Sequence, residues 1–325
     1  MINIDVLERN GLESKPFSEE LFGVTMGDRL EAAGLGDVAH RLAIAGARKH
    51  FLAKSLTPAQ LASVNNKEGM VVAEEAAEFQ KRVALVKVEE SFEGLNNLRE
   101  TDGIDKLAWT FTDTKYHAAS GNWAGKDRLF WTRKQVTDGI LEVGRDLKTA
   151  EFGVHFEDGY RPLGVQEGLY RRRYTMTKDQ NPDWSEEQIM LETRAKTAYT
   201  PKFAAHKGGA AVDMRVRDLK TGELIDIGHG YPDGGAIVAL ESPIVTQEQW
   251  QNRLLLSEIA SKHDLTMYPF EDWHLSKGDT TSAACVEGDQ IPVAIYGPIK
   301  AFDYASGEIT EIYSRNELDT EFKIN

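Results

Sequence analysis

One stretch of the chain decides both the fold and the chemistry: His206–Val216, which reads His-Lys-Gly-Gly-Ala-Ala-Val-Asp-Met-Arg-Val. In its second half Val212 and Met214 flank Asp213, an alternation that indicates a strand with one buried face. The glycines and alanines before the strand allow the backbone to turn closely. If Val212 and Met214 face the core, Asp213 faces a cleft. The stretch therefore predicts an imidazole, His206, beside a turn that leads to a carboxylate in a strand.

A second cluster follows at Pro269–His274, which reads Pro-Phe-Glu-Asp-Trp-His. It supplies a further imidazole, His274, and a carboxylate three residues earlier, Glu271. Each cluster alone is weak evidence, because such pairs are common in sequences and a buried histidine is often only a packing residue. Together His206, Asp213 and His274 form the kind of nitrogen and oxygen ligand set that a catalytic zinc uses, with a fourth position left for water.

Two further groups complete a hydrolytic site. Glu271 is the predicted general base, which takes the proton of the attacking water and passes it to the leaving amine. Arg161, in Asp158–Pro162 (Asp-Gly-Tyr-Arg-Pro), follows a predicted strand and precedes a proline. A cation held in that way is suited to stabilising the oxyanion that forms during attack on a peptide carbonyl.

Hydrophobic periodicity and capping signals outline the elements around these clusters. Helices are expected over 38–52, from Thr57-Pro58 with Gln60, over 131–149, after Pro162, and from Thr246 with Gln249. Strands are expected at 153–156, 212–216, 224–227, 292–296 and 308–313. The mixture favours an α+β fold with hairpins. We divide the chain into a helical accessory region, 1–105, and a zinc peptidase domain, 106–325.

Composition limits the classes of partner. The 325 residues carry a formal net charge of −14, which opposes binding to nucleic acid or to an anionic membrane. The run Arg171–Arg173 is a local exception, interpreted as a solvated or salt-bridged helix face. The single cysteine, Cys285, rules out a thiolate zinc site. No apolar run has the length of a membrane span and the first residues do not resemble a signal peptide, so a cytoplasmic protein is expected.

Three segments, in this order, resemble the D-alanyl-D-alanine dipeptidase family of zinc peptidases, known for its vancomycin-resistance members. They are Tyr160-Arg161-Pro162, His206–Asp213 with Gly209 and Ala211 in place, and Glu271-Asp272-Trp273-His274. The resemblance covers roughly residues 110 to 280. It implies zinc (Zn2+) on His206, Asp213 and His274, Glu271 as general base, Arg161 as stabiliser of the tetrahedral intermediate, and a compact α+β fold with an antiparallel sheet behind the metal.

The sequence departs from the family pattern at Ala204, where a serine linked to recognition of the substrate's amino end is usual, and at Asp272, where an aromatic residue is common. Both changes concern the substrate pocket more than the metal. The expected substrate is a small peptide, with D-alanyl-D-alanine the leading candidate. The alternatives are a muropeptide-cleaving cell-wall carboxypeptidase or endopeptidase, a zinc-binding protein of the same fold without turnover, and a biosynthetic enzyme acting on an unusual amino-acid conjugate. The sequence indicates no oligomeric state.

Overall fold

The computed structural model describes residues 25–46, 58–101, 103, 107–288 and 290–322. A five-stranded sheet with the strand order β2-β4-β5-β7-β6 lies at its centre. Strands β4, β5, β7 and β6 pair antiparallel, whereas the edge strand β2 pairs parallel to β4. The predicted α+β fold with a central antiparallel sheet is confirmed, with one parallel edge added. The strands are β2 (Thr110–Phe111), β4 (Phe152–Asp158), β5 (Ala211–Asp218), β6 (Thr266–Met267) and β7 (His274–Ser276).

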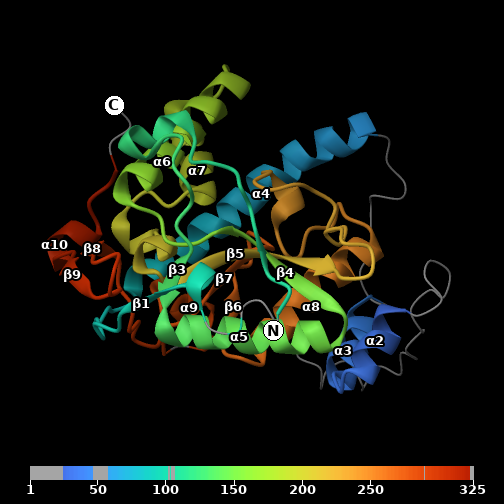
Figure 1. The fold of residues 1–325 in the computed structure, drawn as a ribbon. Coiled ribbons are helices and arrows are strands. Elements are labelled where there is room, and N and C mark those ends of the chain that lie inside the picture. Colours follow the sequence, from blue (N-terminus) through green and yellow to red (C-terminus); the bar gives the residue numbers. More distant parts are fainter. Residues whose placement is uncertain (1–24, 47–57, 102, 104–106, 289, 323–325) are drawn as a thin grey trace.

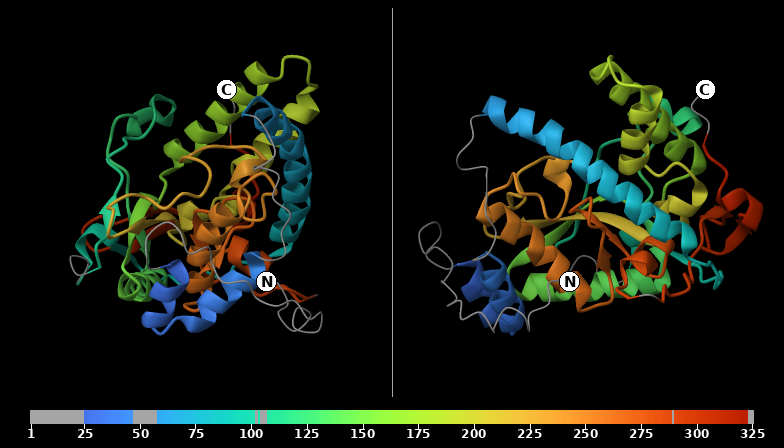
Figure 2. Two further views of the ribbon diagram at one scale, coloured as in Figure 1. Left: turned by 90° about the vertical axis from the view of Figure 1, so that its right-hand side faces the viewer. Right: turned by 180° about the vertical axis from the view of Figure 1, so that it is seen from behind.

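Helices cover both faces of this sheet (Figures 1 and 2). On one face the core includes apolar side chains of α5 (Lys134–Thr149), α8 (Gln247–Ser261), α2 (Met26–Ala32) and α3 (Gly36–Gly46). In α5 the buried residues Val136, Ile140, Val143 and Leu147 recur at helical spacing, which places one apolar stripe against the sheet. On the other side lie α4 (Pro58–Leu85), α6 (Leu163–Gln180) and α7 (Glu186–Lys196).

The polypeptide after β7 packs around the edge of the sheet region. It contains α9 (Thr280–Cys285), the hairpin of β8 (Ile299–Phe302) and β9 (Ile309–Ile312), and α10 (Arg315–Leu318). Ile299 and Phe302 form a second apolar cluster with Tyr160 and with residues of the small β1–β3 sheet. That sheet consists of β1 (Leu95–Asn97) and β3 (Trp131–Arg133). Short 3-10 segments complete the order: η2 (Leu98–Glu100), η4 (Ala118–Trp123), η5 (Pro201–Phe203), η6 (Ala205–Gly208) and η7 (Ala236–Val238).

Several predicted elements are present with small shifts. The helix expected from Thr246 is α8, and Thr246 and Gln249 form the predicted reciprocal cap. The helix expected over 131–149 begins three residues later, because Trp131–Arg133 pairs with β1 as a strand. The helix expected over 38–52 is described only as far as Gly46, and the expected cap residue Thr57 lies outside the described residues.

Two expected strands are wrong. Residues 224–227 make only an isolated bridge, between Arg217 and Leu224, and residues 292–296 make another, between Val88 and Ala294. In the first case Ile227 is buried, but its carbonyl accepts hydrogen bonds from the Arg253 side chain. The side-chain donor takes the place of a strand partner, so the segment continues as a loop.

Residues of the expected accessory region share the core of the expected peptidase domain. Leu30, Val38 and Leu42 lie in the same buried cluster as the sheet residues Val154 and Val212. Nothing in this packing defines a boundary, so the division at residue 105 stays a prediction. Within the described part of the chain, no helix combines the length and the apolar character needed to cross a membrane.

Candidate active site

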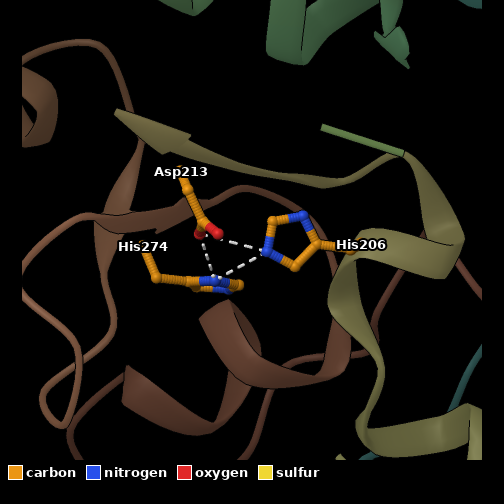
Figure 3. A group of neighbouring side chains, drawn as sticks. All are labelled: His206, Asp213 and His274. Atoms are coloured by element: carbon orange, nitrogen blue, oxygen red, sulfur yellow. Dashed lines mark hydrogen bonds and ion pairs between the residues drawn. The ribbon is translucent and has the colours of Figure 1, made fainter. Parts of the chain in front are cut away.

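The side chains of His206, Asp213 and His274 converge on one point (Figure 3). His206 Nε2 lies 3.1 Å from Asp213 Oδ1 and 3.1 Å from His274 Nδ1. His274 Nδ1 lies 3.1 Å from Asp213 Oδ1. The three atoms therefore form a nearly equilateral triangle, and all three side chains are buried.

Strand register brings together two of these residues, Asp213 and His274. Asp213 in β5 is the direct antiparallel partner of His274 in β7. Directly opposed residues project to the same face of a sheet, with Cβ atoms about 5 Å apart. Because Val212 and Met214 are fully buried in the core on the other face, Asp213 has to project into the site. The sequence alternation predicted this orientation correctly.

A tight turn positions the third residue, His206. His206 lies in η6, which ends at Gly209 with φ of 66°. A Cβ at Gly209 would stand 2.7 Å from Leu95 Cδ2, so only glycine fits there. The buried Arg133 anchors the turn: its Nε donates to the carbonyl of Gly208 at 2.6 Å and its backbone N–H donates to the carbonyl of Gly209 at 2.7 Å.

The hydrogen bonds of His206 leave a lone pair directed into the triangle. Its Nδ1 is 2.7 Å from the carbonyl oxygen of Gly159, which can only accept, so Nδ1 carries the proton. In the neutral ring Nε2 is then an unprotonated acceptor. Burial, reinforced by Arg161, lowers the pKa of His206 and favours that neutral ring. A carbonyl that fixes the tautomer in this way is a common feature of metal-binding histidines.

The donor set fits a zinc ion. Ligand atoms of a tetrahedral zinc at about 2.0–2.1 Å stand roughly 3.3–3.4 Å apart, close to the 3.1 Å edges found here. Burial alone would raise the pKa of Asp213. His206 and Arg161 nevertheless hold that pKa well below its usual range, so this carboxylate is ionised. An ionised carboxylate and imidazole nitrogens around one point are the chemistry that such a cation requires.

Glu271 lies beside the triangle, at the end of the loop that leads into β7. Its Oε2 is 3.8 Å from His274 Nδ1, and its side chain keeps 29% of its surface exposed. Burial of its carboxylate raises the pKa of Glu271 to about 7, while the neighbouring His274 opposes the rise. The backbone N–H of His274 donates to the carbonyl of Glu271 at 3.1 Å, which fixes the two residues relative to each other.

Arg161 also reaches the site. Its Nη2 donates to Asp213 Oδ2 and its Nε to Asp158 Oδ2, both at 2.8 Å. Although burial disfavours its charge, these two carboxylates raise the pKa of Arg161 well above its ordinary value. Arg128 Nη1 donates to the same Asp158 oxygen at 2.8 Å. The guanidinium of Arg161 is thereby held rigidly next to Asp213, so the five residues singled out from the sequence lie together.

Sequence reasoning missed a set of residues that support the site. The hydroxyl of Tyr231 donates to Asp213 Oδ2 at 2.8 Å. Asp272, adjacent to Glu271, is fully buried between two donors: Arg253 Nε at 2.8 Å and His229 Nε2 at 2.9 Å. The unusual aspartate in the last motif was the available signal, since a carboxylate between buried neighbours requires cationic partners.

The departure from the family pattern at position 204 has a packing explanation. Ala204 is buried in a cluster with Tyr170 and Phe322. Phe322 belongs to the segment after α10, and its backbone N–H donates to the carbonyl of Tyr199 at 2.8 Å. The side chain at position 204 therefore packs against the C-terminal segment.

A small pocket extends from Glu271 toward α4, and its empty space of about 370 Å³ includes the open solvent at its mouth. Its apolar lining includes Ala73 and Ala76 of α4, Ala195 of α7 and the ring of Phe270. Arg173 of α6 also lines it, which departs from the expectation that Arg171–Arg173 form a solvated or salt-bridged face. Arg172 is exposed as expected and Arg171 pairs with Glu167 at 3.9 Å, but Arg173 turns inward.

Comparison with known proteins identifies the family of the chain. Residues 110–292 match the family model described as D-ala-D-ala dipeptidase. The chain is 24% identical over 174 residues to a D-alanyl-D-alanine dipeptidase of Enterococcus faecalis, covering 50% of this chain and 83% of that protein. It is 26% identical over 189 residues to a D-alanyl-D-alanine dipeptidase of Streptomyces coelicolor, covering 53% of this chain and 86% of that protein.

The fold and the match define the chain as a metallopeptidase of mixed α and β structure. It belongs to the D-Ala-D-Ala dipeptidase family, a family of zinc metallopeptidases.

Proposed function

We propose that this protein hydrolyses a short peptide, with a dipeptide such as D-alanyl-D-alanine as the leading candidate substrate, and that His206, Asp213 and His274 hold the zinc. The observation that carries the proposal is the convergence of His206 Nε2, His274 Nδ1 and Asp213 Oδ1 within hydrogen-bonding distance of one another. When bound, zinc supplies a Lewis acid that activates water and polarises the scissile carbonyl.

Glu271 is the proposed general base. A carboxylate with a pKa near 7 is half ionised at neutral pH, so it can both accept a proton from water and return it to the leaving amine nitrogen. The position of its Oε2 near His274 Nδ1 places this proton transfer beside the proposed metal ligands. Its partly exposed side chain also borders the pocket, from which a peptide would approach.

Arg161 is the proposed stabiliser of the tetrahedral intermediate. Its two hydrogen bonds to Asp158 and Asp213 orient the guanidinium before substrate arrives, so little reorganisation is needed when negative charge develops on the carbonyl oxygen. Tyr231 and Asp158 are positioning residues in this scheme, because they contact Asp213 and Arg161 respectively.

The proposed substrate is short because α4 and α7 border the pocket next to Glu271. A muropeptide would need to extend past this wall, so the cell-wall peptidase is the less favoured alternative. The family match at 110–292 falls inside the peptidase domain that we propose at 106–325, with residues 1–105 as the helical accessory region. The cytoplasmic location stays a prediction.

The test is a substrate panel read by mass spectrometry. Zinc-loaded protein is incubated with L,L-, L,D- and D,D-dipeptides and with muropeptides, and the metal content is measured in parallel. We expect one zinc per chain and cleavage of a dipeptide. Purified protein that takes up no zinc, or that cleaves only muropeptides, would contradict the proposal.

One variant, with a matched control, distinguishes the role of the general base from that of the metal ligands. Glu271→Gln should keep the zinc and lose about 10²–10⁴-fold in kcat, the usual contribution of general acid–base catalysis. Glu248→Gln, on the exposed start of α8, makes the same chemical change away from the site and should behave as the wild type. Normal turnover by Glu271→Gln would place the base elsewhere.

A further inference from the structure

Arg173 stands out among the charged side chains near the proposed site. It lines the pocket next to Glu271, and a Cβ added at Gly234 would lie 3.2 Å from its Nη1, so the guanidinium rests against the loop at 233–235. Among the residues that the structure describes, Arg173 makes no hydrogen bond and no ion pair. A half-buried guanidinium with five N–H donors and no acceptor is rare without a reason.

The other cation of the pocket is already neutralised. Lys196 forms an ion pair with Glu192 one helical turn earlier in α7. Burial lowers the pKa of Arg173, and the charges of Glu271 and Glu192 oppose the shift. Among the described residues that line the pocket, Arg173 is thus the cation whose donors have no partner.

Another part of the pocket lining is apolar. Ala73 and Ala76 of α4 pack against Ala195 of α7, with Phe270 beside them. Since α4 ends at Leu85, the part of this wall that Ala73 and Ala76 form lies outside residues 110–292, the part matched by the family model. The pocket therefore combines the candidate base, the unpaired guanidinium of Arg173 and an apolar wall to which α4 contributes Ala73 and Ala76.

We propose that this pocket binds the carboxylate-bearing residue of the substrate. Arg173 is the specificity-determining residue and donates hydrogen bonds to that carboxylate. The side chains of α4 limit the size of the adjoining substrate side chain. The inference rests on the proposed function, because Glu271 marks the end of the pocket at which the peptide bond is cut. Arginine matches a carboxylate with two parallel hydrogen bonds, which would give the donors of Arg173 their partner. The carboxylate can be the C-terminal group of a dipeptide or an acidic side chain at that residue.

The experiment measures binding without turnover. The probes are the ketomethylene isostere of D-alanyl-D-alanine, in which a CH₂ replaces the amide nitrogen, its C-terminal amide, and the corresponding isostere ending in D-glutamate α-amide, which keeps only the side-chain carboxylate. Affinities for the zinc-loaded protein are measured by calorimetry for the wild type, Arg173→Gln and Arg173→Lys. Arg172→Gln serves as the matched control, because Arg172 is the exposed neighbour on the same helix.

We expect the wild type and Arg172→Gln to bind one carboxylate probe about 10- to 100-fold more tightly than the amide, the range for a hydrogen bond between charged groups. Arg173→Gln should lose this preference, and Arg173→Lys should restore part of it. Preference for the free C-terminus identifies the main-chain carboxylate as the ligand, and preference for the glutamate probe identifies a side-chain carboxylate. A preference unchanged in a folded Arg173→Gln overturns the proposal, as does equal binding of all three probes by the wild type.

Failure of this inference and failure of the proposed function are distinguishable. If no dipeptide is cleaved but the preference for a carboxylate depends on Arg173, the pocket assignment holds and the reaction is different. If dipeptides are cleaved and Arg173→Gln retains the preference, the reaction holds and another group binds the carboxylate. Thermal unfolding of each variant verifies that it is folded, and Arg173→Lys provides a charged variant if Arg173→Gln is unstable.

Discussion

Asp272 offers a quantitative test of how the loop before β7 is held. Its side chain is completely buried, and so is that of its partner Arg253. Arg253 Nε lies 2.8 Å from Asp272 Oδ2, while its other donors reach the carbonyls of Ile227 and Ala239. Burial lowers the pKa of Arg253 and Asp272 opposes that shift, so this carboxylate is what stabilises the buried positive charge.

The substitution Asp272→Ala leaves that guanidinium with neutral acceptors only. Removal of one partner of a buried ion pair typically destabilises a protein by about 3–5 kcal/mol, because the remaining charge is uncompensated. His229 Nε2 also loses its acceptor at 2.9 Å. We therefore expect the free energy of unfolding to fall by about 3–5 kcal/mol, and Asp272→Asn, which keeps an acceptor oxygen but not the charge, to fall by less.

The assay is urea unfolding followed by tryptophan fluorescence, carried out on the metal-free protein so that zinc binding does not contribute. Asp127→Ala is the matched control: Asp127 pairs with Lys115 at the surface and 77% of its side chain is exposed, so its midpoint should hardly move. If Asp272→Ala unfolds at the same urea concentration as Asp127→Ala, the reasoning about a buried counter-charge is refuted.

Three further predictions follow from the same structure. Arg161→Ala should lower kcat about 10²–10³-fold with zinc retained and KM little changed, measured by steady-state kinetics and metal analysis; a rise in KM alone would show that Arg161 binds substrate instead. The Asp218 carboxylate accepts a hydrogen bond from Arg29 Nη1 at 2.5 Å. Burial alone would raise the pKa of Asp218, but this contact lowers it. The resulting stability is about 1 kcal/mol after allowance for solvent screening. It is present above the unfolded pKa of about 4 and is lost as the pH falls through the lowered folded pKa. Wild type and Asp218→Asn should therefore differ in urea unfolding at pH 7, and the difference should shrink progressively as the pH falls below about 4. Ala204→Ser should leave kcat/KM for D-alanyl-D-alanine no higher and should lower stability by about 1–3 kcal/mol, because the new hydroxyl is buried beside Tyr170 and Phe322; an increase in activity would mean that this position faces the substrate.

The sequence by itself determined the residues that the structure brings together. Alternation around Asp213 fixed which face of β5 it occupies, because the side-chain period of a strand leaves only two choices. Ligand types and the carboxylate three residues before His274 indicated the chemistry. Glycine at 209 marked the turn that the positive φ requires. These features are local, so a single segment of sequence contains them.

Only the tertiary structure decided the pairing and the surroundings. The register that sets Asp213 opposite His274 joins residues 61 positions apart, and no local pattern specifies it. The predictions of strands at 224–227 and 292–296 are wrong for the same reason. The backbone groups of these segments pair with distant residues that the local pattern does not reveal. The inward turn of Arg173 and the contribution of α4 to the pocket beside Glu271 depend on helices that meet in space, α4 with α7 and α6 with α7. Long-range packing determines which of three consecutive arginines faces a pocket, because each of them has the same local preference for solvent.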